Sequence, residues 1–182
     1  MALSKIDAAN FLTGTIPQGN VANASLGAVT ALPGAISTGK VLQVQSTVGV
    51  NIFSTSSTSF VDVTNLSLTI TPAATSSKIL LLLNTNMYAN TLANYWALRW
   101  ERAISGGATT FIGNSTYGIS FARSAQAHDF WGGVGMTYLD SPSTTSEITY
   151  QVQASTTGGS GTIGVGENST NQNTIIALEI GA

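Results

Sequence analysis

The chain has 182 residues, of which only six are basic and eight acidic, whereas an ordinary soluble domain carries about a quarter charged residues. A net charge of −2 with no basic cluster gives no electrostatic reason to bind nucleic acid, and the absence of cysteine excludes disulfides and thiolate metal sites. A hydrophobic content of 43% argues against a disordered chain, and the length fits one domain with an appendage.

The first 40 residues lack the pattern of a folded domain. Their apolar residues stand singly or in pairs between Gly, Ala, Ser and Pro, and such a segment buries too little surface to offset the entropy of ordering it. Small residues do allow close approach to another chain. We therefore expect an extended N-terminal arm over residues 1–40, with a flexible tail as the alternative. The arm's candidate anchoring residues are its apolar points: Ile6, Phe11, Leu12, Ile16, Leu26 and Leu32.

No targeting or membrane segment is evident. The first seven residues lack the apolar core of a secretory signal, and the most apolar run, residues 79–83, is far shorter than the roughly 20 residues that span a bilayer. We expect a protein that is made in a cytoplasm and has no membrane partner.

From residue 41 onward apolar residues alternate with Ser, Thr, Asn and Gln, which is the period of half-buried strands. No stretch keeps a helical period over three turns. Strands are expected at residues 42–44, 61–63, 66–70, 78–87, 96–101, 111–113, 130–139, 148–152, 163–165 and 174–180. Short strands separated by Ser/Thr/Gly/Pro clusters predict an all-β fold, an antiparallel β-sandwich or jelly-roll head over residues 41–182.

The aromatic residues allow two interpretations. Trp96 and Trp100 share a strand face with Leu98, which favours the core of the sandwich. The alternative is a stacking platform for sugars, formed with other aromatic residues: Tyr95, Tyr117, Trp131 and Tyr138.

On the last strand, Glu179 is expected to form an ion pair with Lys78 of a neighbouring strand. Such a cross-strand pair contributes about 0.2–1 kcal/mol to stability.

Residues that suggest chemistry are few. His128 is the only histidine, and neighbouring Asp129 would point to the opposite face of a strand. Asp140 and Glu147 are the carboxylates that could form a glycosidase pair with Asp129, but Asp140 fits the start of a turn. Residues 159–164 match G-x-G-x-x-G, yet lead into a strand-like alternation rather than a helix. We predict no catalytic, cofactor-binding or metal-binding residue.

Several segments resemble virion proteins of tailed bacteriophages. FLTGTIP at residues 11–17 and ISTGKVLQV at 36–44 resemble junctions in fibre and appendage proteins. LTITP at 68–72, TSSKIL at 75–80, YLDSPSTT at 138–145 and the closing TIIALEI at 174–180 resemble a head domain of marine and cyanobacterial phages. These motifs are structural, and none is a catalytic signature.

The resemblance implies a small trimeric virion accessory protein, in which three arms wind or drape together and three β-heads pack. Because the chain has no long shaft, a non-enzymatic capsid decoration (cement or head-fibre) protein is expected, with the major capsid protein or another virion protein as partner. The alternative is a short tail fibre or receptor-binding tip that contacts a host surface glycan. Either would lie on the virion surface after synthesis in the bacterial cytoplasm.

Overall fold

The structure, a computed structural model, describes residues 40–50, 52–89, 95–123, 130–156, 161–166 and 172–181. All six predicted anchoring residues of the arm lie outside these ranges. Within them the chain forms eleven strands and no helix, and hence no helix able to cross a membrane. The strands are β1 (Val41–Gly49), β2 (Phe53–Thr55), β3 (Val61–Ile70), β4 (Lys78–Ala89), β5 (Tyr95–Ile104), β6 (Thr109–Ile112), β7 (Ser120–Arg123), β8 (Phe130–Asp140), β9 (Ile148–Ser155), β10 (Ile163–Val165) and β11 (Asn173–Ile180).

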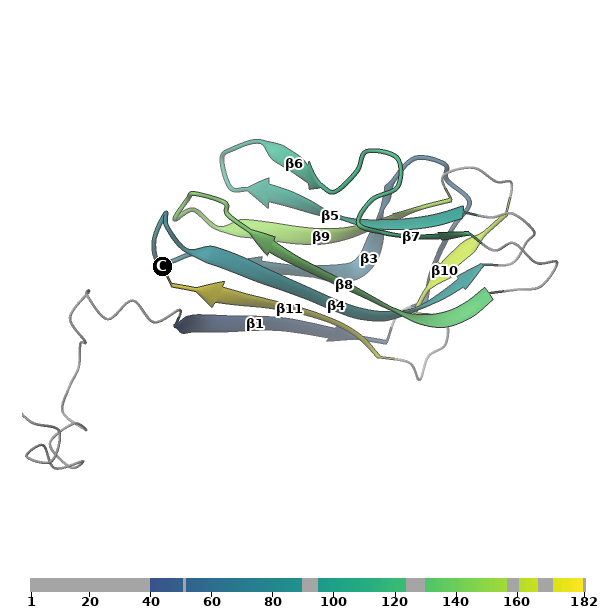
Figure 1. Cartoon of the computed structure of the whole chain (residues 1–182), viewed down its shortest axis with the longest axis horizontal. Coiled ribbons are helices and arrows are strands. Elements are labelled where there is room, and N and C mark those ends of the chain that lie inside the picture. The colour runs from purple at the N-terminus through teal and green to yellow at the C-terminus, as the bar shows by residue number, and fades with distance from the viewer. Residues whose placement is uncertain are drawn as a thin grey trace, which may run out of the picture. The chain divides into compact units, whose positions relative to one another are not determined.

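The strands form two antiparallel sheets that pack face to face (Figure 1). The first sheet has the order β1-β11-β4-β10-β2, with β8 on the other side of β4, and the second has the order β3-β9-β5-β6, with β7 also paired to β5. Without the strands of three or four residues, the orders are β1-β11-β4-β8 and β3-β9-β5. Successive long strands therefore alternate largely between sheets, as in a jelly roll. The predicted all-β sandwich is confirmed.

Strict alternation places one face of each long strand in the core. Along β4, the odd-numbered residues Ile79 to Ala89 are buried, Thr85 among them, whereas the even-numbered residues are not. The second sheet contributes Trp96, Leu98 and Trp100 of β5 and the inward residues of β9 to the same core. Trp96 and Trp100 are thus core residues, as their spacing favours.

Two sequence expectations are corrected. Lys78 lies opposite Ile180, whereas Glu179 lies opposite Ile79 and is fully buried, so the expected ion pair between Glu179 and Lys78 does not form. The strand list also lacks β2 and β7, which have three and four residues.

Candidate functional site

Asp140, considered above as a catalytic carboxylate, is held by structural contacts. Arg102 Nη1 lies 2.7 and 2.9 Å from its two carboxylate oxygens, and the Tyr150 hydroxyl donates to it at 2.6 Å. The Ser141 backbone N–H donates to it as well, at 2.9 Å, which fits the predicted turn. Burial, followed by the hydrogen bond to Asp140, raises the pKa of Tyr150. This cluster joins β8 of the first sheet to β5 and β9 of the second.

The outer side of the first sheet carries a cluster of aliphatic side chains. The pairing register places Val44 of β1, Leu178 of β11, Leu80 of β4 and Leu139 of β8 directly opposite one another, in one row across four strands. We call this row and its outward neighbours the apolar face. The neighbours are Ile176, Ile180 and Leu82.

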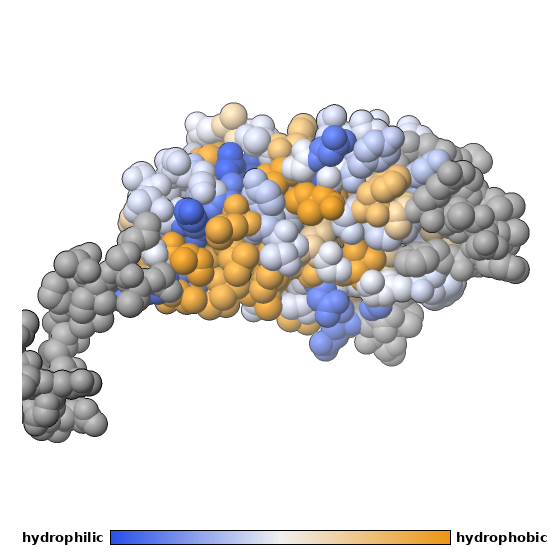
Figure 2. Space-filling view, viewed as in Figure 1, coloured by the Kyte–Doolittle hydropathy of each residue, from blue (hydrophilic) through white to orange (hydrophobic). Residues whose placement is uncertain are grey.

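Solvent reaches much of the apolar face. Val44 and Leu139, at its two edges, keep 55% and 49% of their surface exposed, and Figure 2 shows a continuous hydrophobic area over β1, β11 and β4. Soluble monomers rarely expose a contiguous apolar patch of more than a few hundred Å². The strand β1 is also an edge strand without proline or charge, the kind of edge that proteins normally protect against pairing with other chains.

The outer side of the second sheet has a different chemistry, centred on Arg99 of β5. The guanidinium carbon lies 4.0 Å from the ring centre of Phe60 and 3.8 Å from that of Phe111. A guanidinium between two aromatic rings is attracted to both, at about 0.5–2 kcal/mol for each ring. Burial lowers the pKa of Arg99, partly offset by the charge of Glu101. Arginine remains protonated in proteins, so the site keeps its cation.

A hydrogen-bonded network fixes the direction of Arg99. Its Nε donates to Gln153 Oε1 at 2.8 Å, and the Gln153 amide nitrogen donates to Asp62 and Glu101, both at 2.8 Å. Asp62, Gln153 and Arg99 are directly opposite one another on β3, β9 and β5. Burial and the nearby charge of Asp62 raise the pKa of Glu101. The sheet register therefore builds this network.

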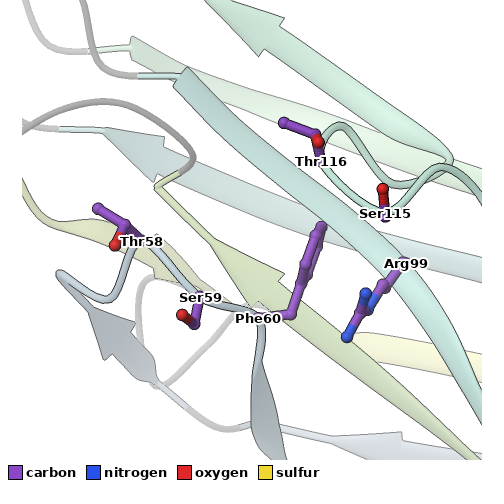
Figure 3. A pocket seen from close by; sticks show the side chains of 6 residues that line it. All are labelled: Thr58, Ser59, Phe60, Arg99, Ser115 and Thr116. Carbon is purple, nitrogen blue, oxygen red and sulfur yellow. The ribbon is translucent and has the colours of Figure 1, made fainter.

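A pocket of about 350 Å³ opens beside Arg99 (Figure 3). Besides Arg99 and Phe60, hydroxyl side chains from two separate segments line it: Thr58, Ser59, Ser115 and Thr116. Among the described residues, Arg99 donates hydrogen bonds through Nε alone, so its two terminal nitrogens are free for a ligand. We call this site the arginine pocket.

Local hydrogen bonds fix the backbone of both segments that line the arginine pocket. On one side, Ser57 Oγ bonds both the N–H and the C=O of Ser59. On the other, Asn114 and Gly118 exchange two backbone hydrogen bonds, and Asn114 Oδ1 accepts from the N–H groups of Thr116 and Tyr117 at 2.8 and 2.9 Å. The hydroxyls thus stand on tight turns rather than loose loops.

Exposed aromatic rings adjoin the arginine pocket. Phe121 lies opposite Ala97, which is two residues from Arg99 on the same outward side of β5. Its ring stacks on Tyr95 with centres 5.6 Å apart and meets the edge of Tyr117 at 4.7 Å. Tyr95 and Tyr117 of the aromatic set considered for sugar stacking therefore do come together. Trp131 instead lies against Tyr88, on the outer side of the first sheet.

The remaining residues that the sequence suggested for chemistry form no site within the described residues. His128 and Asp129 lie outside the described residues, and so do residues 159 and 160 of the glycine motif. The described end of that motif, Gly161–Gly164, leads into β10 and not into a helix. Glu147 is exposed. No group of three or more His, Cys, Asp or Glu in the described ranges could hold a metal ion.

Sequence reasoning missed the arginine pocket. The alternation of β5 puts Arg99 on the face opposite Trp96 and Trp100, but Phe60, Phe111 and Ser115 come from three other segments. No fixed spacing connects them. No local sequence signal distinguishes Arg99, because the same strand also carries Glu101 and Arg102.

Comparison with protein-family models and with curated protein sequences finds no match. Among solved structures, the chain is similar to chains of infectious bursal disease virus. For the Gx strain, the identity is 16% and the TM-score 0.30, over 75% of this chain and 37% of that one. For the VP2 subviral particle, the identity is 15% and the TM-score 0.34, over 76% of this chain and 38% of that one. For the T13 viral particle, the identity is 14% and the TM-score 0.34, over 79% of this chain and 38% of that one.

This chain thus spans less than two fifths of the length of those viral chains. TM-scores of this size do not establish a common fold, so these matches carry no weight for the role of this chain.

Proposed function

We propose that this chain is a non-enzymatic structural protein of a bacteriophage particle, a trimeric capsid decoration protein that holds the shell through its N-terminal arm and stabilises it. The observation that carries the proposal is the apolar face, an aliphatic surface that is partly exposed on a chain with very few charges. A surface of this kind is stable in water when another surface covers it.

Copies of the same chain are the proposed occupants of the apolar face. The row Val44, Leu178, Leu80 and Leu139 contains no charge, and Lys78, opposite Ile180 at the start of β4, is exposed. Identical rows can therefore meet without burying an unpaired charge. The unprotected edge of β1 favours the same outcome. The resemblance of the arm and head motifs to trimeric phage proteins supports three copies rather than two.

Attachment to the shell is assigned to the arm, residues 1–40, and to its apolar residues. The test deletes residues 1–39 from the gene and measures the protein in purified particles by quantitative mass spectrometry. We expect the truncated protein to accumulate as a folded head and to be missing from particles. A double substitution, Phe11→Ser with Leu12→Ser, should lower incorporation in the same direction. Normal incorporation of both variants contradicts the proposal.

The second candidate is a short tail fibre or receptor-binding tip, and the arginine pocket with its adjacent aromatic rings favours it. Copy number separates the two functions in the same mass-spectrometric experiment. Hundreds of copies in each particle indicate decoration of the shell, whereas a few to a few dozen indicate a tail position.

A further inference from the structure

The arginine pocket offers hydrogen-bond donors and acceptors at fixed positions. Arg99 presents its two terminal nitrogens, held in place by Phe60 and Phe111 on the ring faces and by Gln153 at Nε. Four residues with hydroxyl side chains line the same pocket from two segments (Figure 3). A guanidinium can only donate, whereas a hydroxyl both donates and accepts. A ligand rich in hydroxyl groups matches this combination.

Charge distinguishes neutral from acidic ligands. Asp62 and Glu101 lie on the same outer side of the sheet and are joined to Arg99 through Gln153. The two carboxylates offset the single positive charge of Arg99, so an anionic ligand gains no net attraction. The N–H groups of Arg99 remain donors for neutral oxygen atoms.

Aromatic rings beside the pocket supply an apolar contact. Phe111, Tyr117 and Phe121 are exposed by 52%, 51% and 41%, and Tyr117 directly follows the pocket residue Thr116. A pyranose ring has C–H groups on its faces and hydroxyls at its rim. It can therefore lie against an aromatic ring while its rim makes hydrogen bonds. The volume of about 350 Å³ is near the lower end of small-ligand pockets, which fits one sugar unit.

We propose that the arginine pocket binds a neutral pyranose unit of a saccharide, with sugar hydroxyls bonded to Arg99 and to the pocket hydroxyls and with the sugar ring against the adjacent aromatic side chains. This binding site is independent of the position of the protein on a particle. The same site would bind sugar whether the chain is a shell protein or a fibre tip.

The test is ligand-observed NMR of the full-length protein with the methyl glycosides of glucose, galactose, mannose and N-acetylglucosamine, and with glucuronic acid. We expect at least one neutral glycoside to bind more tightly than glucuronic acid. Arg99→Lys keeps the charge but loses the planar fork, and should weaken binding about tenfold. Tyr117→Ala removes an exposed ring and should weaken it as well.

Ser115→Glu is the sharper variant, because Ser115 is exposed and its replacement does not disturb the core. A glutamate there takes up space in the pocket, and its carboxylate accepts the hydrogen bonds that the terminal nitrogens of Arg99 would give to a sugar, so binding should fall by about a hundredfold or more. Ser146→Glu, at an exposed serine in the 141–147 loop, is the matched control and should bind like the wild type. The proposal is overturned if no neutral glycoside binds, if glucuronic acid binds more tightly, or if Ser115→Glu binds normally.

Discussion

Glu179 is a carboxylate without solvent exposure in the middle of the last strand. Burial alone would raise its pKa. However, the hydrogen bonds it accepts outweigh burial and leave its pKa below the ordinary value. Gln43 Nε2 donates to one oxygen at 2.6 Å and the Ala73 N–H to the other at 2.7 Å. The carboxylate thereby ties the edge strand β1 and the 71–77 loop to β11.

This geometry predicts how Glu179→Gln behaves. The amide leaves at least one of these donors without an acceptor, so the free energy of unfolding at pH 7 should fall by about 1–3 kcal/mol. The pKa of Glu179 is lower in the folded state, so its stabilising effect is present above about pH 4.3 and is lost as the pH falls through the folded value. Chemical denaturation of the variant should therefore show a flatter loss of stability with acidification.

Glu147→Gln is the control for this prediction, because Glu147 is exposed. Its stability should stay within about 0.5 kcal/mol of the wild type at both neutral and acidic pH. Equal behaviour of the two variants would mean that the hydrogen bonds to Glu179 contribute no stability.

At the scale of elements, the 113–118 loop depends on a glycine. Gly118 has φ +65°, and a Cβ atom there would lie 2.2 Å from the carbonyl oxygen of Leu98. The neighbouring Ile119 N–H donates to that same oxygen at 2.8 Å, so neither backbone can move away cheaply. Gly106, with φ +72°, has no atom within 4 Å of the corresponding position.

The two glycines therefore predict different costs for the same substitution. Gly106→Ala meets only backbone strain and should cost about 1 kcal/mol of unfolding free energy. Gly118→Ala adds a backbone clash and should cost about 3 kcal/mol or more. Equilibrium denaturation of both variants measures the difference. Equal costs would show that the loop shifts freely.

The last strand shows both the reach and the limit of sequence reasoning. Alternation predicts the strand at residues 174–180 almost at its observed bounds, Asn173–Ile180. It does not predict which side is buried. The more apolar set, Ile176, Leu178 and Ile180, faces outward, while Glu179 is buried. A buried carboxylate is tolerated because its hydrogen-bond partners come from distant segments, which a local pattern cannot reveal.

The same limit applies to the candidate site. The outward position of Arg99 follows from the alternation of β5, but its two ring partners, Phe60 and Phe111, are set by how other segments cross the sheet. The short strands β2 and β7 were missed because three or four residues contain too few alternations to detect.

At the scale of the whole head, the two outer sides of the sandwich differ in chemistry. The outer side of the first sheet carries the apolar face, and that of the second carries the arginine pocket, its carboxylates and the exposed aromatic rings. Association through the first side leaves the second open to solvent. Binding of a sugar and assembly of copies are therefore compatible in one molecule.

Sedimentation of the full chain tests assembly through the apolar face. The wild type should sediment as a species of three times the 18.7 kDa chain mass, also in high salt, because apolar contacts are not screened. Val44→Asp with Leu139→Asp places two carboxylates in the interface without touching the core, and burying an unpaired charge costs several kcal/mol, so this variant should be a folded monomer. Thr110→Asp, at an exposed position of β6 in the other sheet, should leave the trimer intact. A monomeric wild type, or a trimeric double variant, would contradict a role of this face in self-association.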